Sequence, residues 1–95
     1  MPLFMIYALD KPGSLAARLA ARPAHLEHVN AHRGQLRFAG PLLDEAGEMN
    51  GSLLIFEGET EEAARAFAEG DPYAQAGLFE RVEIRSWRQT IPSPS

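Results

Sequence analysis

Two segments of the chain, Leu3–Leu9 and Gly51–Glu57, carry apolar side chains at both alternating sets of positions. Alternate residues of a strand point to opposite faces of a sheet, so strands of this kind need cover on both faces. A chain of 95 residues has room for one domain and one hydrophobic core. The fold must therefore cover both faces of a sheet with few elements.

The segments around these two strands have the capping residues and breakers of helices and turns. Ser, Thr and Asp accept hydrogen bonds from the first free N–H groups of a helix, and Gly and Pro mark helix ends and starts. We expect a turn at Asp10–Gly13, a helix capped by Ser14 that Pro23 interrupts or restarts and that Gly34 stops, a strand at Gln35–Leu43 and a polar loop at Asp44–Asn50. We then expect a helix from Thr60 to Gly70, a helical turn opened by Asp71-Pro72, and a strand at Leu78–Trp87.

The order of these elements is βαββαβ, which predicts an α+β fold of the ferredoxin-like type. In this layout two main helices cover one face of a four-stranded antiparallel sheet, and the first and last strands lie side by side. The other face would expose more apolar surface than a monomer normally shows, because the first and third strands are apolar on both sides. Pairing two such faces about a twofold axis would cover them, so we predict a homodimer through the sheet face.

Composition limits the kinds of partner and the location of the protein. The net charge is −4 and the Lys and Arg residues are scattered singly, so we expect no nucleic-acid partner. The apolar run of the N-terminal segment ends at Asp10 without a basic start, and no run is long enough to cross a membrane. We expect a cytoplasmic protein with one domain at residues 1–89 and a mobile tail at residues 90–95, which contains two prolines and two serines.

Three histidines, His25, His28 and His32, follow one another at spacings of three and four on the first predicted helix. This spacing would suit a metal ion, but no cysteine is present and no further ligand is obvious, so we expect no metal. We expect instead that His28 and His32 are polar residues on a solvated face. His25 then lies at the border of the apolar stripe formed by Leu26 and Val29.

Three other polar residues have both a structural and a functional interpretation. Asp71 is a good helix cap, and a carboxylate that caps a helix can also orient an imidazole if His25 lies close to it. Ser52 either binds a ligand or only begins a strand, and Arg22 is either an anion anchor or a solvated or ion-paired side chain. The chain has no phosphate-binding glycine motif and no Ser-His-Asp motif, so we expect no nucleotide and no cofactor.

Several segments resemble the YCII-related (YciI-like) family, namely RPAHLEHV, AGPLL, GSLLIFE and GDPYAQAGLFERVEI. The combination of R-P-x-H-L with D-P-[YF]-x-x-A-G is the more specific part of this resemblance. It implies a dimeric α+β barrel and an active site in which a helix histidine pairs with the aspartate of the D-P turn, here His25 and Asp71. Ser52 is similar to a position that lines the site in the family.

The resemblance also indicates a class of reaction. A dehydrochlorinase of a chlorinated hydroxyhydroquinone and lactone-ring enzymes such as muconolactone isomerase are relatives or share the barrel, which implies lyase or isomerase chemistry on small, acidic, ring-shaped molecules. We therefore expect an enzyme in which His25 moves a proton, Asp71 holds the tautomer of His25, and Arg22 or Ser52 binds substrate oxygens. The alternative is a dimeric domain that binds a small ligand without turnover.

Overall fold

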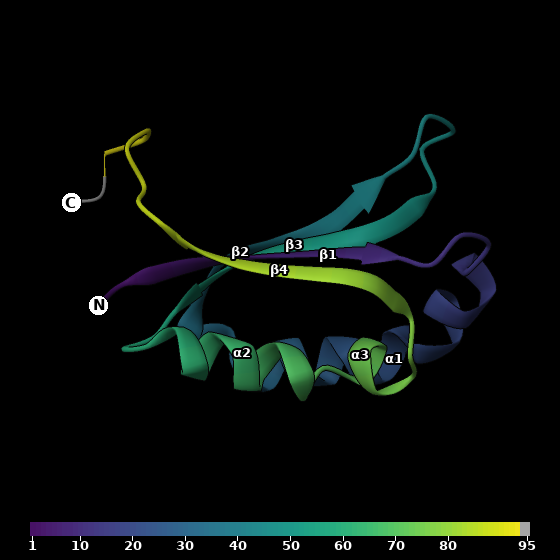
Figure 1. Cartoon of the computed structure of the whole chain (residues 1–95), viewed down its shortest axis with the longest axis horizontal. Coiled ribbons are helices and arrows are strands. Elements are labelled where there is room, and N and C mark those ends of the chain that lie inside the picture. The colour runs from purple at the N-terminus through teal and green to yellow at the C-terminus, as the bar shows by residue number, and fades with distance from the viewer. Residues whose placement is uncertain (94–95) are drawn as a thin grey trace.

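The computed structural model describes residues 1–93, which form one four-stranded sheet with the helices on one of its faces (Figure 1). The elements are β1 (Leu3–Asp10), α1 (Leu15–Ala31), a short 3-10 turn (Arg33–Gln35), β2 (Leu36–Leu43), β3 (Met49–Glu57), α2 (Glu61–Glu69), α3 (Pro72–Gln75) and β4 (Phe79–Trp87). The sheet is antiparallel in the order β2-β3-β1-β4, with the first and last strands adjacent. The predicted ferredoxin-like α+β fold is confirmed.

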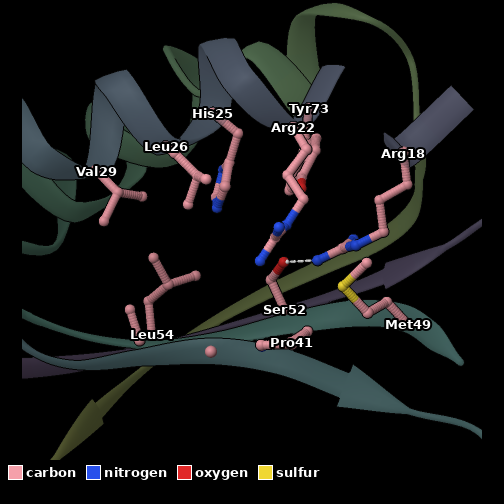
Figure 2. Close-up of a pocket in the computed structure, with 12 residues that line it drawn as sticks. Arg18, Arg22, His25, Leu26, Val29, Pro41, Met49, Ser52, Leu54 and Tyr73 are labelled. Carbon is pink, nitrogen blue, oxygen red and sulfur yellow. Dashed lines mark hydrogen bonds between the residues drawn. The ribbon is translucent and has the colours of Figure 1, made fainter. Parts of the chain in front are cut away.

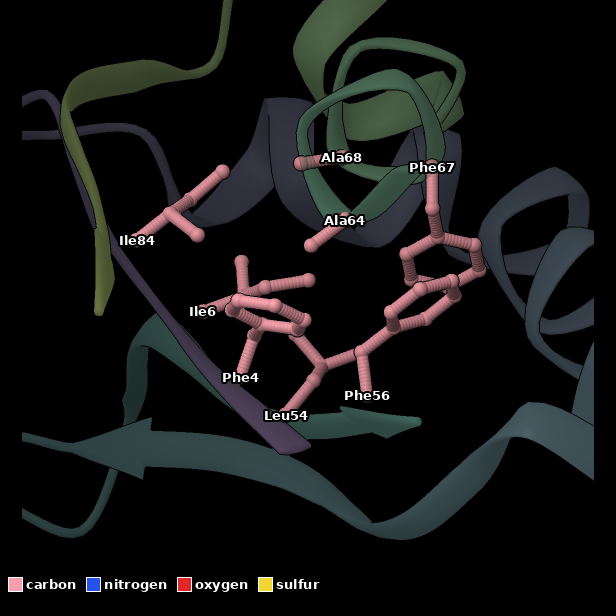
Figure 3. Close-up of a cluster of buried hydrophobic side chains, with 8 residues drawn as sticks. All are labelled: Phe4, Ile6, Leu54, Phe56, Ala64, Phe67, Ala68 and Ile84. Atoms are coloured by element: carbon pink, nitrogen blue, oxygen red, sulfur yellow. The ribbon is translucent and has the colours of Figure 1, made fainter. Parts of the chain in front are cut away.

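The hydrophobic core lies between the central strands and α2 (Figure 3). Every second residue of β1, from Phe4 to Asp10, is buried beneath the helices. The small side chains of Ala64 and Ala68 let α2 approach the sheet closely, and Phe67 stacks on Phe56 with 5.1 Å between the ring centroids. The packing is tight under α2, whereas a pocket remains between α1 and strands β2 and β3.

Helix α1 continues across Pro23, so the predicted interruption at this residue is wrong. Proline cannot donate to the carbonyl of Leu19 one turn earlier, and in a helix interior it costs about 3 kcal/mol relative to alanine. The packing of α1 against the rest of the domain outweighs this cost, because tertiary contacts supply most of the stability of a helix. Ser14 does occupy the cap position, but its side chain accepts no capping hydrogen bond.

A register shift in β2 changes one predicted alternation. In the sequence, Leu36 and Phe38 alternate with Gln35 and Arg37, which predicts that Leu36 and Phe38 share a side of the strand. The pairing with β3 is irregular between these two residues, and Leu36 packs on the core whereas Phe38 is 56 % exposed. An extra residue on one strand reverses the direction of the side chains that follow it.

No element of residues 1–93 covers the sheet face opposite the helices, which we call the open face (Figure 1). Its apolar part comes from β1, β3 and β2 and includes Tyr7, Leu53 and Phe38. The β4 part is charged, because Glu83 pairs with Arg81 and Arg85. The homodimer through this face stays a prediction.

The described residues contain no helix with the length and apolar character needed to cross a membrane. Residues 90–93 of the predicted tail form neither helix nor strand, whereas Pro94 and Ser95 lie outside the described residues. The domain boundaries, the mobility of the tail, the cytoplasmic location and the lack of a nucleic-acid partner remain predictions.

Candidate active site

A pocket of about 160 Å3 lies between α1 and strands β2 and β3 (Figure 2). The pocket is lined by three of the residues that we predicted for a site, namely Arg22, His25 and Ser52. The other polar lining residues are Arg18 and Tyr73, and the apolar wall is formed by Leu26, Val29, Ala39, Gly40, Pro41, Met49 and Leu54. Basic groups thus meet apolar side chains in one small pocket.

The structure brings His25 and Asp71 together. Nδ1 of His25 lies 2.9 Å and 3.0 Å from the two carboxylate oxygens of Asp71. Asp71 also accepts a 2.9 Å hydrogen bond from the backbone N–H of Tyr73 and so caps α3. The structural and the orienting role of Asp71 are therefore compatible.

The contact with Asp71 determines which nitrogen of His25 faces the pocket without a proton. An ionised carboxylate only accepts hydrogen bonds, so the neutral imidazole carries its hydrogen on Nδ1 and has its lone pair on Nε2. The side chain of His25 is 12 % exposed, and Figure 2 shows its ring pointing from α1 toward the sheet. His25 therefore has a proton-accepting nitrogen at a solvent-reachable pocket rather than in a sealed core.

Tyr73 packs against both His25 and Arg18. Its ring stacks on His25 with 3.9 Å between centroids and 14° between planes. The guanidinium carbon of Arg18 lies 4.4 Å from the centroid of the same ring. Burial raises the pKa of the Tyr73 phenol above its ordinary value, so this side chain is a neutral hydrogen-bond donor at physiological pH.

Arg18 and Asp10 form a buried ion pair beside Ser52, and the sequence reasoning missed both charged residues. Nη1 of Arg18 lies 3.0 Å from each carboxylate oxygen of Asp10. Nη2 donates to the carbonyl oxygen of Gly51 at 2.6 Å and to Oγ of Ser52 at 2.5 Å. Burial raises the pKa of Asp10, while the charge of Arg18 and its hydrogen bond act in the opposite direction.

A signal for Arg18 was present in the sequence. Arg18, Arg22, His25 and Val29 follow at spacings of four, three and four, which places them on one face of a continuous helix. The expected break at Pro23 divided this face, with Arg18 before the break and His25 and Val29 after it. Asp10 carried no comparable signal, because it lies at the expected start of a turn.

Arg22 is exposed at the rim of the pocket, and Figure 2 shows its side chain extending toward Ser52. Within residues 1–93 it takes part in no ion pair. Its positive charge is thus available to a bound anion.

His28 and His32 pack against α2, so the prediction of a solvated face is wrong for both. The Nε2–H group of His28 donates to the carbonyl oxygen of Phe67 at 3.0 Å, and the two rings are 4.7 Å apart. The Nδ1–H group of His32 donates to the carbonyl oxygen of His28 at 2.8 Å. In the part of the chain that the structure describes, no three His, Asp or Glu side chains are grouped closely enough to hold a metal ion.

Comparison with known protein families and sequences gives a consistent result. The YCII-related domain matches residues 2–88. Protein YciI of Escherichia coli O6:H1 is 41 % identical over 97 residues, which cover 94 % of this chain and 99 % of that protein. The derivative of benzaldehyde biosynthesis cluster protein C of Emericella nidulans is 38 % identical over 80 residues, or 75 % of this chain and 79 % of that protein.

Comparison with solved structures supports the same fold. The 5-chloro-2-hydroxyhydroquinone dehydrochlorinase of Burkholderia phenoliruptrix AC1100, in complex with 2,5-dihydroxybenzoquinone, has a TM-score of 0.86 and 34 % identity. The match covers 93 % of this chain and 95 % of that one. A NIPSNAP-domain protein of Burkholderia xenovorans, with a TM-score of 0.55 and 17 % identity over the whole length of both chains, shares the fold alone.

Proposed function

The chain belongs to the YCII-related domain family, and we propose that it is a small enzyme in which His25, oriented by Asp71, transfers a proton on a small oxygen-bearing ring compound. The observation that carries the proposal is the hydrogen bond between His25 and Asp71 beside a pocket that Arg22 and Ser52 also line. The likeness to a dehydrochlorinase supports small-ligand enzyme chemistry for this fold. The reaction is of the lyase or isomerase type.

The proposed mechanism begins at Nε2 of His25. This nitrogen takes a proton from a carbon next to a carbonyl, and the electron pair of the broken bond forms a new double bond. In an elimination the leaving group departs with its own electron pair, whereas in an isomerisation the imidazolium returns the proton to another carbon. The carboxylate of Asp71 stabilises the imidazolium and holds the ring in one tautomer throughout.

The size and charge of the pocket support a compact anionic ligand. A cavity of about 150 Å3 can hold benzene, so a pocket of about 160 Å3 fits one substituted ring. Leu26, Val29 and Leu54 would contact the faces of such a ring, and Arg22 would neutralise an oxygen anion. The 2,5-dihydroxybenzoquinone held by the structural relative is a compound of this class.

Two substrates test the proposal, 5-chloro-2-hydroxyhydroquinone by release of chloride and muconolactone by its change in absorbance. We expect turnover of at least one of them without added cofactor and in the presence of a metal chelator. His25→Gln should lower kcat by roughly 100-fold or more, which is the usual size of a general acid-base contribution. Asp71→Asn should have a similar effect, because the amide can cap α3 but cannot hold the same tautomer.

Asp44→Asn is the matched control, since Asp44 accepts backbone hydrogen bonds from Ala46 and Glu48 in a turn outside the pocket lining. It should leave kcat unchanged. Full activity in His25→Gln would contradict the proposal. Tight binding of these ring compounds with no turnover of any would instead favour the alternative of a domain that only binds a ligand.

A further inference from the structure

Arg18 is a charged side chain that is 2 % exposed and is held on several sides. Asp10 binds its Nη1 through both carboxylate oxygens, and the ring of Tyr73 lies against the guanidinium. A buried ion pair is a weak source of stability, because apolar residues of similar volume often stabilise as well or better. The position of the pair at the wall of the pocket therefore suggests a role in binding.

The hydrogen bond between Arg18 and Ser52 restricts what the serine hydroxyl can do. A guanidinium has only N–H donors, so Nη2 of Arg18 donates and Oγ of Ser52 accepts. The hydrogen of the hydroxyl must point away from Arg18. Among residues 1–93, no hydrogen bond has the Ser52 hydroxyl as its donor, and Ser52 lines the pocket.

We infer that Arg18, held by Asp10, is a positioning residue that fixes the hydroxyl of Ser52 as a hydrogen-bond donor toward an oxygen of the bound ligand. The inference rests on the proposed function and adds a rule of selectivity. Ser52 selects a carbonyl or phenolate oxygen at this point of the pocket and disfavours an ammonium or amide N–H group. A ligand that presents a donor there would leave two donors facing each other without an acceptor.

The first test needs no ligand. Neutron diffraction on crystals of the unliganded, perdeuterated protein locates the deuterium of the Ser52 hydroxyl. We expect it to point into the pocket, with the deuterium of Nη2 of Arg18 directed at Oγ. A Ser52 deuterium directed at a carbonyl oxygen of the protein would overturn the inference.

The second test is a double-mutant cycle with 2,5-dihydroxybenzoquinone as the probe. Ser52→Ala removes the donor, and Arg18→Lys keeps the charge beside Asp10 but lacks the fork that reaches Ser52 at the same time. Each single change should raise the dissociation constant about tenfold. The double variant should also have a dissociation constant about tenfold above that of the unmodified protein, because both changes remove the same interaction. Both single variants should shift the absorption band of the bound compound in the same direction.

Arg65→Lys, in the exposed pair with Glu61, is the control and should leave the dissociation constant unchanged. An increase of about a hundredfold in the double variant would overturn the inference, because it would mean that Arg18 acts independently of Ser52. Failure of the unmodified protein to bind the probe would count against the proposed function instead. The neutron map would then still decide the orientation of the Ser52 hydroxyl, and it does so even if a variant fails to fold.

Discussion

Tyr73 is the residue through which the two polar clusters of the site meet. Its ring contacts His25 and the guanidinium of Arg18, and its backbone N–H group binds Asp71. The ring of Phe79 in β4 packs edge-on against the Tyr73 ring, with 6.2 Å between the ring centroids. A shift of this one ring would therefore disturb both the proton-transfer pair and the ion pair.

The buried phenol predicts a loss of stability at alkaline pH. Burial raises the pKa of Tyr73 in the folded protein above its unfolded value of about 10, so the folded state holds the proton more tightly. This contribution is fully present below about pH 10 and is lost as the pH rises toward the folded pKa. The free energy of unfolding, measured in urea at about pH 9 and about pH 11, should fall less in Tyr73→Phe than in the unmodified protein.

Tyr7→Phe is the control for this experiment, since Tyr7 is the other tyrosine and lies on the open face. This variant should still lose stability at alkaline pH, because it keeps the phenol of Tyr73. Identical pH dependence in Tyr73→Phe and the unmodified protein would show that the phenol does not titrate differently on folding.

At the scale of elements, β3 is the strand on which the site and the sheet depend together. It pairs with β1 and β2, and its Gly51 and Ser52 both accept hydrogen bonds from Arg18. A Cβ atom at Gly51 would lie 2.6 Å from the carbonyl oxygen of Ala8 and 2.9 Å from Cδ1 of Leu42. The close approach of neighbouring elements therefore requires glycine at this position.

We expect Gly51→Ala to lower the free energy of unfolding by about 1–3 kcal/mol, because the methyl group forces backbone atoms apart in a packed sheet. Gly40→Ala in the neighbouring β2 is the matched control, since a Cβ there meets nothing within 4 Å. The control should change the free energy of unfolding by less than about 0.5 kcal/mol. Urea denaturation of both variants decides the comparison, and equal effects would contradict the steric explanation.

At the scale of the whole molecule, the open face argues for self-association. Leu53 of the central strand β3 is 38 % exposed and Phe38 of the edge strand β2 is 56 % exposed, on a face that no helix of residues 1–93 covers. The charged side chains of β4 border this apolar area, as polar residues commonly border an interface. Two copies that pack face to face would cover both apolar areas.

We therefore expect light scattering at micromolar concentration to give about twice 10.4 kDa. Leu53→Arg should give a monomer, because it buries an unpaired charge in the interface. Leu19→Arg, at a residue of α1 that is 50 % exposed, should leave the mass unchanged. A monodisperse monomer of the unmodified protein would rule out this dimer.

The sequence by itself determined the elements, their order and the main candidates for the site. Two-sided apolar alternation in β1 and β3 and caps such as Asp71 are local signals, and local signals specify strands, helices and turns. The antiparallel layout then placed the end of α2 near α1, so a contact between His25 and Asp71 could be expected from topology. The roles assigned to these residues remain predictions for the experiments above.

The tertiary structure alone decided which charged side chains are buried and what they bind. The partners of Arg18 are eight residues before it and thirty-four residues after it in the sequence, in two different strands. The continuity of α1 across Pro23 and the packing of His28 on Phe67 also depend on distant elements. Periodicity reports which face of an element is apolar, whereas the burial of a charge depends on a partner that only the folded chain brings within reach.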